Sequence, residues 1–165
     1  MRIDVDVRTN PPDLLARLGR TQQATVAVDG VVKAVAHRLA FHAKRGAPYT
    51  TGALRRSVVP HQLRLTEWEV VAVGSEEKPY AAYMEFGTRP HWPPREAIEN
   101  WVRIKLNIHS ASEIRRVAYL VSRAIARRGL APRYYMKQAF ETISSVLKGL
   151  VARHLPKIIR AITGR

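Results

Sequence analysis

Pro94 divides this 165-residue chain into a first part with both alternating and helical spacing of the apolar residues and a second part with helical spacing alone. Before Pro94, apolar residues alternate with polar ones in three short segments, which predict strands at residues 2–8, 57–65 and 67–73. After Pro94 the apolar residues recur every three or four positions, which predicts helices. The pattern therefore indicates an α+β fold: a small antiparallel sheet packed by a long N-terminal helix, with a helical C-terminal half.

The long helix is predicted between the first strand and the second. It begins at Asn10, because Asn10-Pro11-Pro12-Asp13 supplies a capping oxygen, a proline in the first turn and an acidic side chain. Its apolar stripe consists of Leu14, Leu18, Thr21, Thr25, Val28, Val32, Val35 and Leu39, and the helix continues to about Ala43. Asp29-Gly30 favours a kink or break in the middle, and Gly46-Ala47-Pro48 ends the helix.

Turn and cap residues organise the rest of the chain. The strand pair turns near Thr66, and Pro60 makes the strand before that turn an edge strand or a bulged one. Residues 87–94 form an ordered loop rich in Gly and Pro. Helices are then predicted at residues 95–106, 112–128 and 132–155. Ser112 is the expected cap of the second of these, and Gly129 is its expected end.

The last predicted helix carries an apolar stripe that stops at a proline. The stripe consists of Met136, Phe140, Ile143, Leu147, Leu150 and His154, and Pro156 is expected to kink or end the helix. The chain length fits one compact domain. We therefore expect a single domain over residues 1–165, with a strand, helix and hairpin part at 1–94 and a helical part at 95–165.

The charge of the chain restricts its partners. The sequence has 28 Lys and Arg against 13 Asp and Glu, a net charge of +15. Residues 95–165 hold 15 of these bases but only 4 of the acids. A strongly basic chain indicates a negatively charged partner, such as nucleic acid, an anionic membrane or an acidic protein surface.

Residues that could support catalysis or a cofactor are scarce. The chain has no Cys, which excludes disulfides, thiolate-ligated zinc and cysteine catalysis. Its six His do not form the pair four residues apart with an intervening Glu that zinc hydrolysis uses, and no Gly-rich phosphate loop occurs. We expect no enzyme activity, no cofactor and no metal, although a site assembled from scattered residues remains an alternative. The N-terminus does not resemble a signal peptide, and no apolar stretch is long enough to span a bilayer.

One predicted helix presents a stripe of arginines. In residues 112–128 the apolar face contains Ile114, Val117, Val121, Ala124 and Ile125. Arg116, Arg123 and Arg127 fall on the opposite face, with Arg115 and Arg128 beside them. These five arginines, here called the basic stripe, suit contact with DNA phosphates or with the carboxylates of an acidic partner. An ordinary solvated face is the alternative interpretation.

Three segments carry a family resemblance. The first is Thr51-Gly52-Ala53-Leu54-Arg55-Arg56-Ser57, the second runs from Tyr80 to Thr88 with Pro90 after it, and the third runs from Ile125 to Phe140. Together they resemble the tail-completion or head-tail joining (neck) proteins of long-tailed bacteriophages, the family named after the tenth gene product of a lambdoid phage. The resemblance covers roughly residues 10–145. Residues 93–128 insert two helices that the shortest family members lack.

The resemblance implies a structural virion protein without a reaction to catalyse. It implies a closed ring of six subunits in the phage neck, located in the virion and assembled in the host cytoplasm. Its partners would be a head-tail adaptor or portal-side protein and a tail protein. The family-motif positions are Thr51, Gly52, Leu54, Ser57 and Tyr80, and the expected subunit or partner contacts are Glu85, Phe86, Gly87, Thr88, Arg89 and Trp92.

The residue types suggest roles for several of these positions. Leu54 and Phe86 are expected to anchor the loops onto the core, and Glu85 to pair with Arg55, Arg89 or a neighbouring subunit. Trp92 suits a rigid aromatic anchor at a subunit contact, with burial in its own subunit as the alternative. The rival to a neck protein is a basic DNA-binding module, packaging-related or nucleoid-like, which rests on the charge alone.

Overall fold

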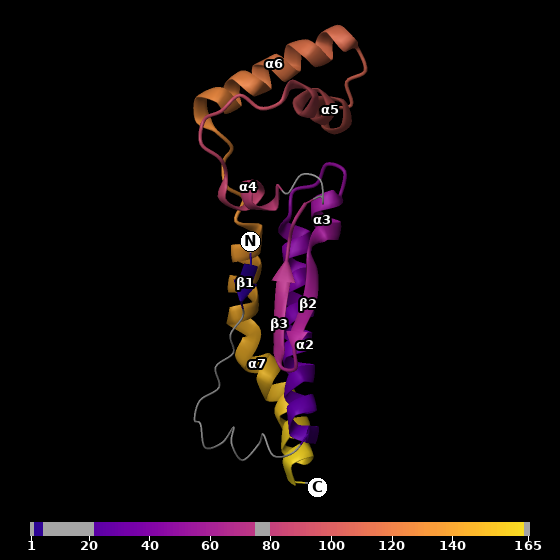
Figure 1. Cartoon of the computed structure of the whole chain (residues 1–165), viewed down its shortest axis with the longest axis vertical. Coiled ribbons are helices and arrows are strands. Elements are labelled where there is room, and N and C mark those ends of the chain that lie inside the picture. Colours follow the sequence, from indigo (N-terminus) through magenta and orange to yellow (C-terminus); the bar gives the residue numbers. More distant parts are fainter. Residues whose placement is uncertain (1, 5–21, 75–79, 164–165) are drawn as a thin grey trace.

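Two long helices form the body of the molecule. The computed structural model describes residues 2–4, 22–74 and 80–163, and in it α2 (Gln22–Gly46) lies alongside α7 (Tyr135–Thr163) (Figure 1). The side chains that α2 buries against its neighbours are mostly small: Ala24, Val31, Val35, Ala36, Leu39, Ala40 and Ala43. Because helix separation depends on the side chains at the contact, this alanine-rich face lets the two helices pack closely. The predicted long N-terminal helix and helical C-terminal half are confirmed.

A three-stranded antiparallel sheet covers the body. Its strands are β1 (Arg2–Asp4), β2 (Val59–Arg64) and β3 (Glu67–Val71), in the order β1-β3-β2. The central strand buries Trp68 and Val70 in the main core, as period-two alternation requires. Thr66, with φ of 66°, makes the tight turn, and β2 is the predicted edge strand containing Pro60. The small antiparallel sheet packed by the long helix is thus confirmed.

Asp29 of α2 holds the turn of the β2–β3 hairpin. One oxygen of its carboxylate, Oδ1, accepts hydrogen bonds from Gln62 Nε2 (3.1 Å), the Thr66 backbone N–H (2.9 Å) and Trp68 Nε1 (3.0 Å). A carboxylate is a strong acceptor for such donors. This single side chain therefore sets the position of the hairpin on the helix.

The predicted break at Asp29-Gly30 is wrong, since α2 continues through both residues. The position of Asp29 is fixed by its three hydrogen bonds, and Gly30 is exposed with no atom near its missing side chain. A single glycine lowers helix stability only modestly. The predicted helix start at Asn10, the stripe from Leu14 to Thr21 and most of the first strand lie outside the described residues.

Four shorter helices follow α2 in the chain. They are α3 (Ala53–Ser57), α4 (Ala81–Phe86), α5 (Arg95–Leu106) and α6 (Ala111–Arg128). Ser57 was predicted to begin a strand, but it is the last residue of helix α3. Helices α5 and α6 pack on each other around Val102, Ile114 and Ala118, a cluster separate from the main core. This α5–α6 hairpin lies beyond one end of the body (Figure 1).

The ends of the last two helices differ in part from the prediction. Helix α6 begins at Ala111, with Ser110 rather than Ser112 as its N-cap residue, and Gly129 ends it as expected. Helix α7 begins at Tyr135 instead of Pro132, and it continues through Pro156 to Thr163. A proline removes one helical hydrogen bond, and the helix formers on both sides of Pro156 continue the helix.

The buried face of α7 is also shifted from the predicted stripe. Met136, Ile143 and Leu150 are buried as expected, but Phe140 is 41% exposed. Tyr135 and Ala139 are buried in its place. Tyr135 packs against Gly46 at the end of α2, where a Cβ on the glycine would lie 3.4 Å from the Tyr135 Cβ. The predicted parts at residues 1–94 and 95–165 are therefore in contact. Helix α7 of the second part belongs to the same core as α2 and the sheet of the first part.

Candidate assembly interface

The first motif segment fastens α3 to the end of the sheet. Leu54 is buried in the main core, as predicted. The Ser57 hydroxyl donates to the Leu54 carbonyl (2.8 Å) and accepts the backbone N–H groups of Val73 (3.3 Å) and Gly74 (2.8 Å). Gly52 supplies the positive φ, 79°, at the N-cap of α3. These motif residues build a scaffold rather than a reactive site.

Tyr80 closes the same corner from the second motif segment. Its ring lies over Gly74, where a Cβ would be only 2.8 Å from ring carbons. The backbone N–H groups of Tyr80 and Ala81 both donate to the Val73 carbonyl (3.1 and 3.2 Å). The start of α4 is therefore fixed to the end of β3.

Glu85 is buried and caps the N-terminus of α7. Its side chain is 1% exposed, and its two carboxylate oxygens accept the backbone N–H groups of Met136 (2.9 Å) and Lys137 (3.0 Å). A negative charge is stabilised there by unpaired N–H groups and by the helix dipole. Burial, with the nearby charge of Glu85, raises the pKa of Tyr135 to about 12, so this neighbour stays neutral.

The predicted partners of Glu85 are wrong, because both of its carboxylate oxygens cap α7. Its carboxylate pairs with neither Arg55 nor Arg89, and its burial keeps it away from any surface that a neighbouring subunit could contact. Arg55 instead donates from Nε to the Ala47 carbonyl (3.0 Å). Glu85 supports the loop that follows it from inside the molecule.

The two chain segments that enter and leave the α5–α6 hairpin cross at a pair of glycines, here called the Gly87–Gly129 crossing. Both glycines have positive φ, 74° and 73°. Next to them, Thr88 N–H donates to the Leu130 carbonyl (3.0 Å), and Leu130 N–H donates to the Thr88 hydroxyl (3.1 Å). A Cβ on Gly87 would lie 2.3 Å from the Leu130 oxygen, and one on Gly129 would lie 1.9 Å from the Thr88 oxygen. Only glycine permits so close a backbone contact.

The loop after the crossing presents aromatic side chains to solvent. Trp92 is 60% exposed and Arg89 is also exposed. Phe86 is 59% exposed, so the prediction that it anchors the loop in the core is wrong: the inward position belongs to Glu85, and Phe86 is turned outward. Exposed aromatics on a rigid support are typical of protein interfaces.

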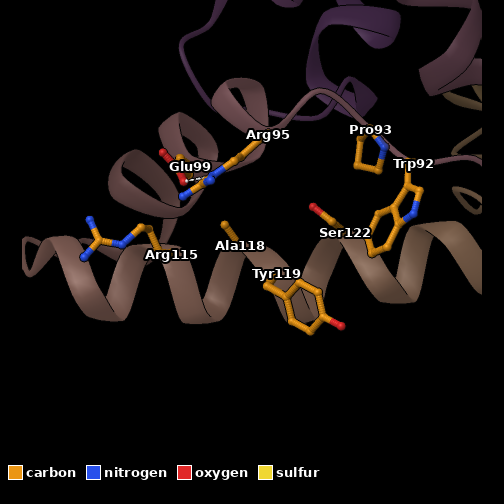
Figure 2. Close-up of a pocket in the computed structure, with 8 residues that line it drawn as sticks. All are labelled: Trp92, Pro93, Arg95, Glu99, Arg115, Ala118, Tyr119 and Ser122. Atoms are coloured by element: carbon orange, nitrogen blue, oxygen red, sulfur yellow. Dashed lines mark hydrogen bonds and ion pairs between the residues drawn. The ribbon is translucent and has the colours of Figure 1, made fainter.

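A groove separates this loop from α6 (Figure 2). It has a volume of about 440 Å³ and is lined by Trp92, Pro93, Arg95, Glu99, Arg115, Ala118, Tyr119 and Ser122. Trp92 and Pro93 form one end, Arg115 forms the other, and Ala118 and Ser122 lie between them (Figure 2). The rings of Trp92 and Tyr119 have their centroids 6.2 Å apart. Sequence reasoning missed this groove, because Tyr119 carries no local signal that Trp92 lies beside it.

The basic stripe lies on the exposed face of α6. All five of its arginines are exposed, and none forms an ion pair with a residue that the structure describes. The opposite face buries Ile114, Ala118, Ser122 and Ile125, whereas Ala124, predicted to be apolar and inward, is exposed. The predicted division of the helix into an apolar and a basic face is therefore confirmed.

The described part of the chain offers neither a metal site nor a membrane-spanning helix. Residues 2–4, 22–74 and 80–163 contain no group of three or more His, Asp or Glu arranged to hold a metal ion. No helix within those ranges is long and apolar enough to cross a membrane.

Comparison with known proteins gives one match. The family model described as "Bacteriophage HK97-gp10, putative tail-component" matches residues 13–87, which include the first motif segment and the second as far as Gly87. No curated protein and no solved structure matches the chain. The family resemblance drawn from the motifs is thus confirmed, and it indicates a structural virion component. Residues 13–87 are thus similar to the HK97-gp10-like family of bacteriophage tail components.

Proposed function

We propose that this protein is a ring subunit of the phage neck that completes the tail or joins the head to the tail. The observation that carries the proposal is the family match over residues 13–87, together with a rigid corner at the end of that segment. Glu85 and the Gly87–Gly129 crossing fix the backbone there. A subunit that works by shape needs such a fixed contact surface.

The loop from Phe86 to Trp92 supports the ring proposal. It leaves two large aromatic side chains largely exposed, although apolar groups of that size are normally buried. A neighbouring subunit in the ring would cover them, and the covered aromatic area would provide much of the contact energy. The proposed ring has six subunits. We also propose that the isolated chain is monomeric, because rings that form too early would compete with ordered assembly.

Trp92→Ala tests the proposed contact. The variant should fold with stability close to that of the wild type, because the lost side chain is mostly in solvent. Phage carrying it should give heads and tails that fail to join, with infectious particles reduced by about 100-fold or more, as expected for loss of a central aromatic anchor. Electron microscopy of lysates and plaque counts measure this outcome.

A matched control is Phe41→Ala, which removes an equally exposed aromatic from α2. Normal particles from Phe41→Ala and defective ones from Trp92→Ala would support the contact. Normal particles from both variants, or subunits that stay monomeric in the assembled neck, would contradict the ring proposal. An unfolded Trp92→Ala protein would place Trp92 in the core and also count against it.

We further propose that the basic stripe docks on an acidic protein ring, either the head-tail adaptor or portal-side protein or a tail protein. The stripe has no counter-charge within the described residues, and the helical half is where the basic excess lies. A basic DNA-binding module, packaging-related or nucleoid-like, is the alternative that the same arginines support. Tight binding to DNA that must pass through the neck would slow its exit, which favours the protein partner.

Reversing Arg116, Arg123 and Arg127 to Glu separates these partners. The triple variant should lose less than about 1 kcal/mol of stability per site and at least about tenfold in affinity for the acidic ring protein. Reversal of Lys148, Arg153 and Lys157 on α7 is the control with the same change in charge. If instead the stripe binds duplex DNA, the log-log salt slope should fall by about one for each lost phosphate contact. Unchanged binding to both partners would make the stripe a solvated face.

A further inference from the structure

The groove between the Trp92 loop and α6 has the chemistry of a peptide-binding site. We infer that it receives an acidic, extended segment of a partner protein, with an apolar side chain beside Trp92 and carboxylates at the Arg115 end. The inference uses the proposed assembly role only for the identity of the partner. The groove itself is tested with a peptide, so either idea can fail without the other.

One end of the groove is shaped for an apolar side chain. Trp92 and Tyr119 stand at 36° to one another with their centroids 6.2 Å apart, and Pro93 adds a rigid wall. Pockets of roughly 300–1,000 Å³ with aromatic walls and a few polar groups are typical for small ligands and peptide side chains. A volume of about 440 Å³ is in that range.

The other end of the groove is shaped for carboxylates. Arg95 donates from Nε to Glu99 Oε1 (2.7 Å), which fixes its guanidinium and occupies one carboxylate position. Arg115 has no ion-pair partner among the described residues and lies at the end of the groove opposite Trp92 (Figure 2). Guanidinium groups bind carboxylates in a bidentate, charge-assisted way. Arg115 is therefore the guanidinium in this lining that is open to a partner's carboxylate.

The charges of the chain disfavour a second copy as the occupant. Among the described acidic side chains, Asp29 and Glu85 accept hydrogen bonds within the fold, Glu67, Glu69, Glu99 and Glu141 pair with basic side chains of the same molecule, and Glu96 and Glu113 are exposed on the hairpin. Residues 87–130, which include the hairpin, contain nine Lys and Arg against three Glu. Two hairpins of this charge would repel each other if they faced one another, whereas a neighbour in a ring would approach the Trp92 loop with a different face. The occupant must therefore bring its own negative charge.

The shape of the groove favours a peptide over nucleic acid. Its lining combines Trp92, Pro93 and Tyr119 with two arginines, and because Arg95 is already paired with Glu99, Arg115 is the one guanidinium left for an anion, which is too few for a phosphate backbone. Backbone phosphates match the basic stripe on the outer face of α6 better, since that stripe spans the helix from Arg115 to Arg128.

A titration of the full-length protein with a short peptide tests the inference. The probe is the capped hexapeptide Asp-Glu-Leu-Pro-Glu-Asp, and its neutral counterpart is Asn-Gln-Leu-Pro-Gln-Asn. The readout is the indole N–H resonance of Trp92, assigned by comparison with Trp92→Phe. The acidic peptide should shift this resonance saturably, and the neutral one should bind at least about fivefold more weakly because it cannot make charged hydrogen bonds.

Three variants make the result specific. Arg115→Glu should weaken peptide binding by about tenfold, whereas Arg123→Glu, an equal change of charge outside the groove, should change it by less than about twofold. Glu99→Gln should strengthen binding by roughly threefold, because it removes a competing carboxylate and frees Arg95. Tyr119→Ala should weaken binding with the net charge unchanged, so the inference does not depend on Arg115→Glu folding.

Several outcomes would overturn the inference. They are an unshifted Trp92 resonance at millimolar peptide, equal binding of the two peptides, and equal weakening by Arg115→Glu and Arg123→Glu. Oligothymidine that shifts the same resonance at a lower concentration than the peptide would assign the groove to nucleic acid instead.

Discussion

Glu85→Ala is expected to lower the free energy of unfolding by about 3–5 kcal/mol. The substitution leaves the Met136 and Lys137 N–H groups without an acceptor at the start of α7, and each hydrogen bond to a charged group contributes about 1.5–3 kcal/mol. It also removes a negative charge from the positive end of the helix dipole. Equilibrium urea denaturation followed by circular dichroism measures the change.

Two further variants separate the lost acceptor from the lost volume. Glu85→Gln keeps the shape but offers one acceptor oxygen, so its stability should fall between those of the wild type and Glu85→Ala. Glu141→Ala removes a carboxylate from an exposed pair with Lys137 on the same helix, and should change stability by less than about 0.5 kcal/mol. Similar small losses for Glu85→Ala and Glu141→Ala would show that the cap is not needed.

Gly129→Ala is also expected to lower the free energy of unfolding strongly. Gly129 lies in the Gly87–Gly129 crossing, on the segment that leaves the α5–α6 hairpin. The new Cβ would overlap the Thr88 carbonyl oxygen at 1.9 Å, so the backbone must move apart. The backbone of Gly129, with φ of 73° and ψ of −164°, lies in a region that almost only glycine adopts, which adds about 1–3 kcal/mol for a residue with a side chain. We expect a total loss of about 3 kcal/mol or more, seen in urea denaturation, with faster proteolysis between Phe86 and Arg95.

Gly149→Ala supplies the control of opposite sign. Gly149 lies inside α7 with no atom within 4 Å of the position a Cβ would take, so alanine there should stabilise the protein by about 0.5–1 kcal/mol. A Gly129→Ala protein as stable as the wild type would show that the two chain segments separate easily. The crossing would then be no rigid support for the hairpin.

Local signals explain why the elements themselves could be predicted. Alternating residues around Thr66 mark the hairpin, Pro60 marks its edge strand, and Gly129 marks the end of α6. Each of these features depends on residues that are near one another in the sequence. The basic face of α6 could be predicted for the same reason, since it follows from the helical period alone.

The features that sequence reasoning missed all depend on distant partners. Asp29 contacts residues 33 to 39 positions away, which is why the uninterrupted helix at Gly30 carried no local signal. Glu85 caps a helix whose N–H groups lie 51 and 52 positions further on. Trp92 meets Tyr119 only because α5 and α6 fold back on each other. Nothing in the neighbouring sequence distinguishes such residues from solvated ones.

The hydrogen bonds between Thr88 and Leu130 have an evolutionary consequence. They hold the two ends of a 41-residue excursion at neighbouring points, so that stretch can be shortened, extended or exchanged while the distance between its ends stays the same. A change in the length of that stretch would therefore leave α2 and α7 in place, since the stretch starts and ends at the same pair of hydrogen bonds.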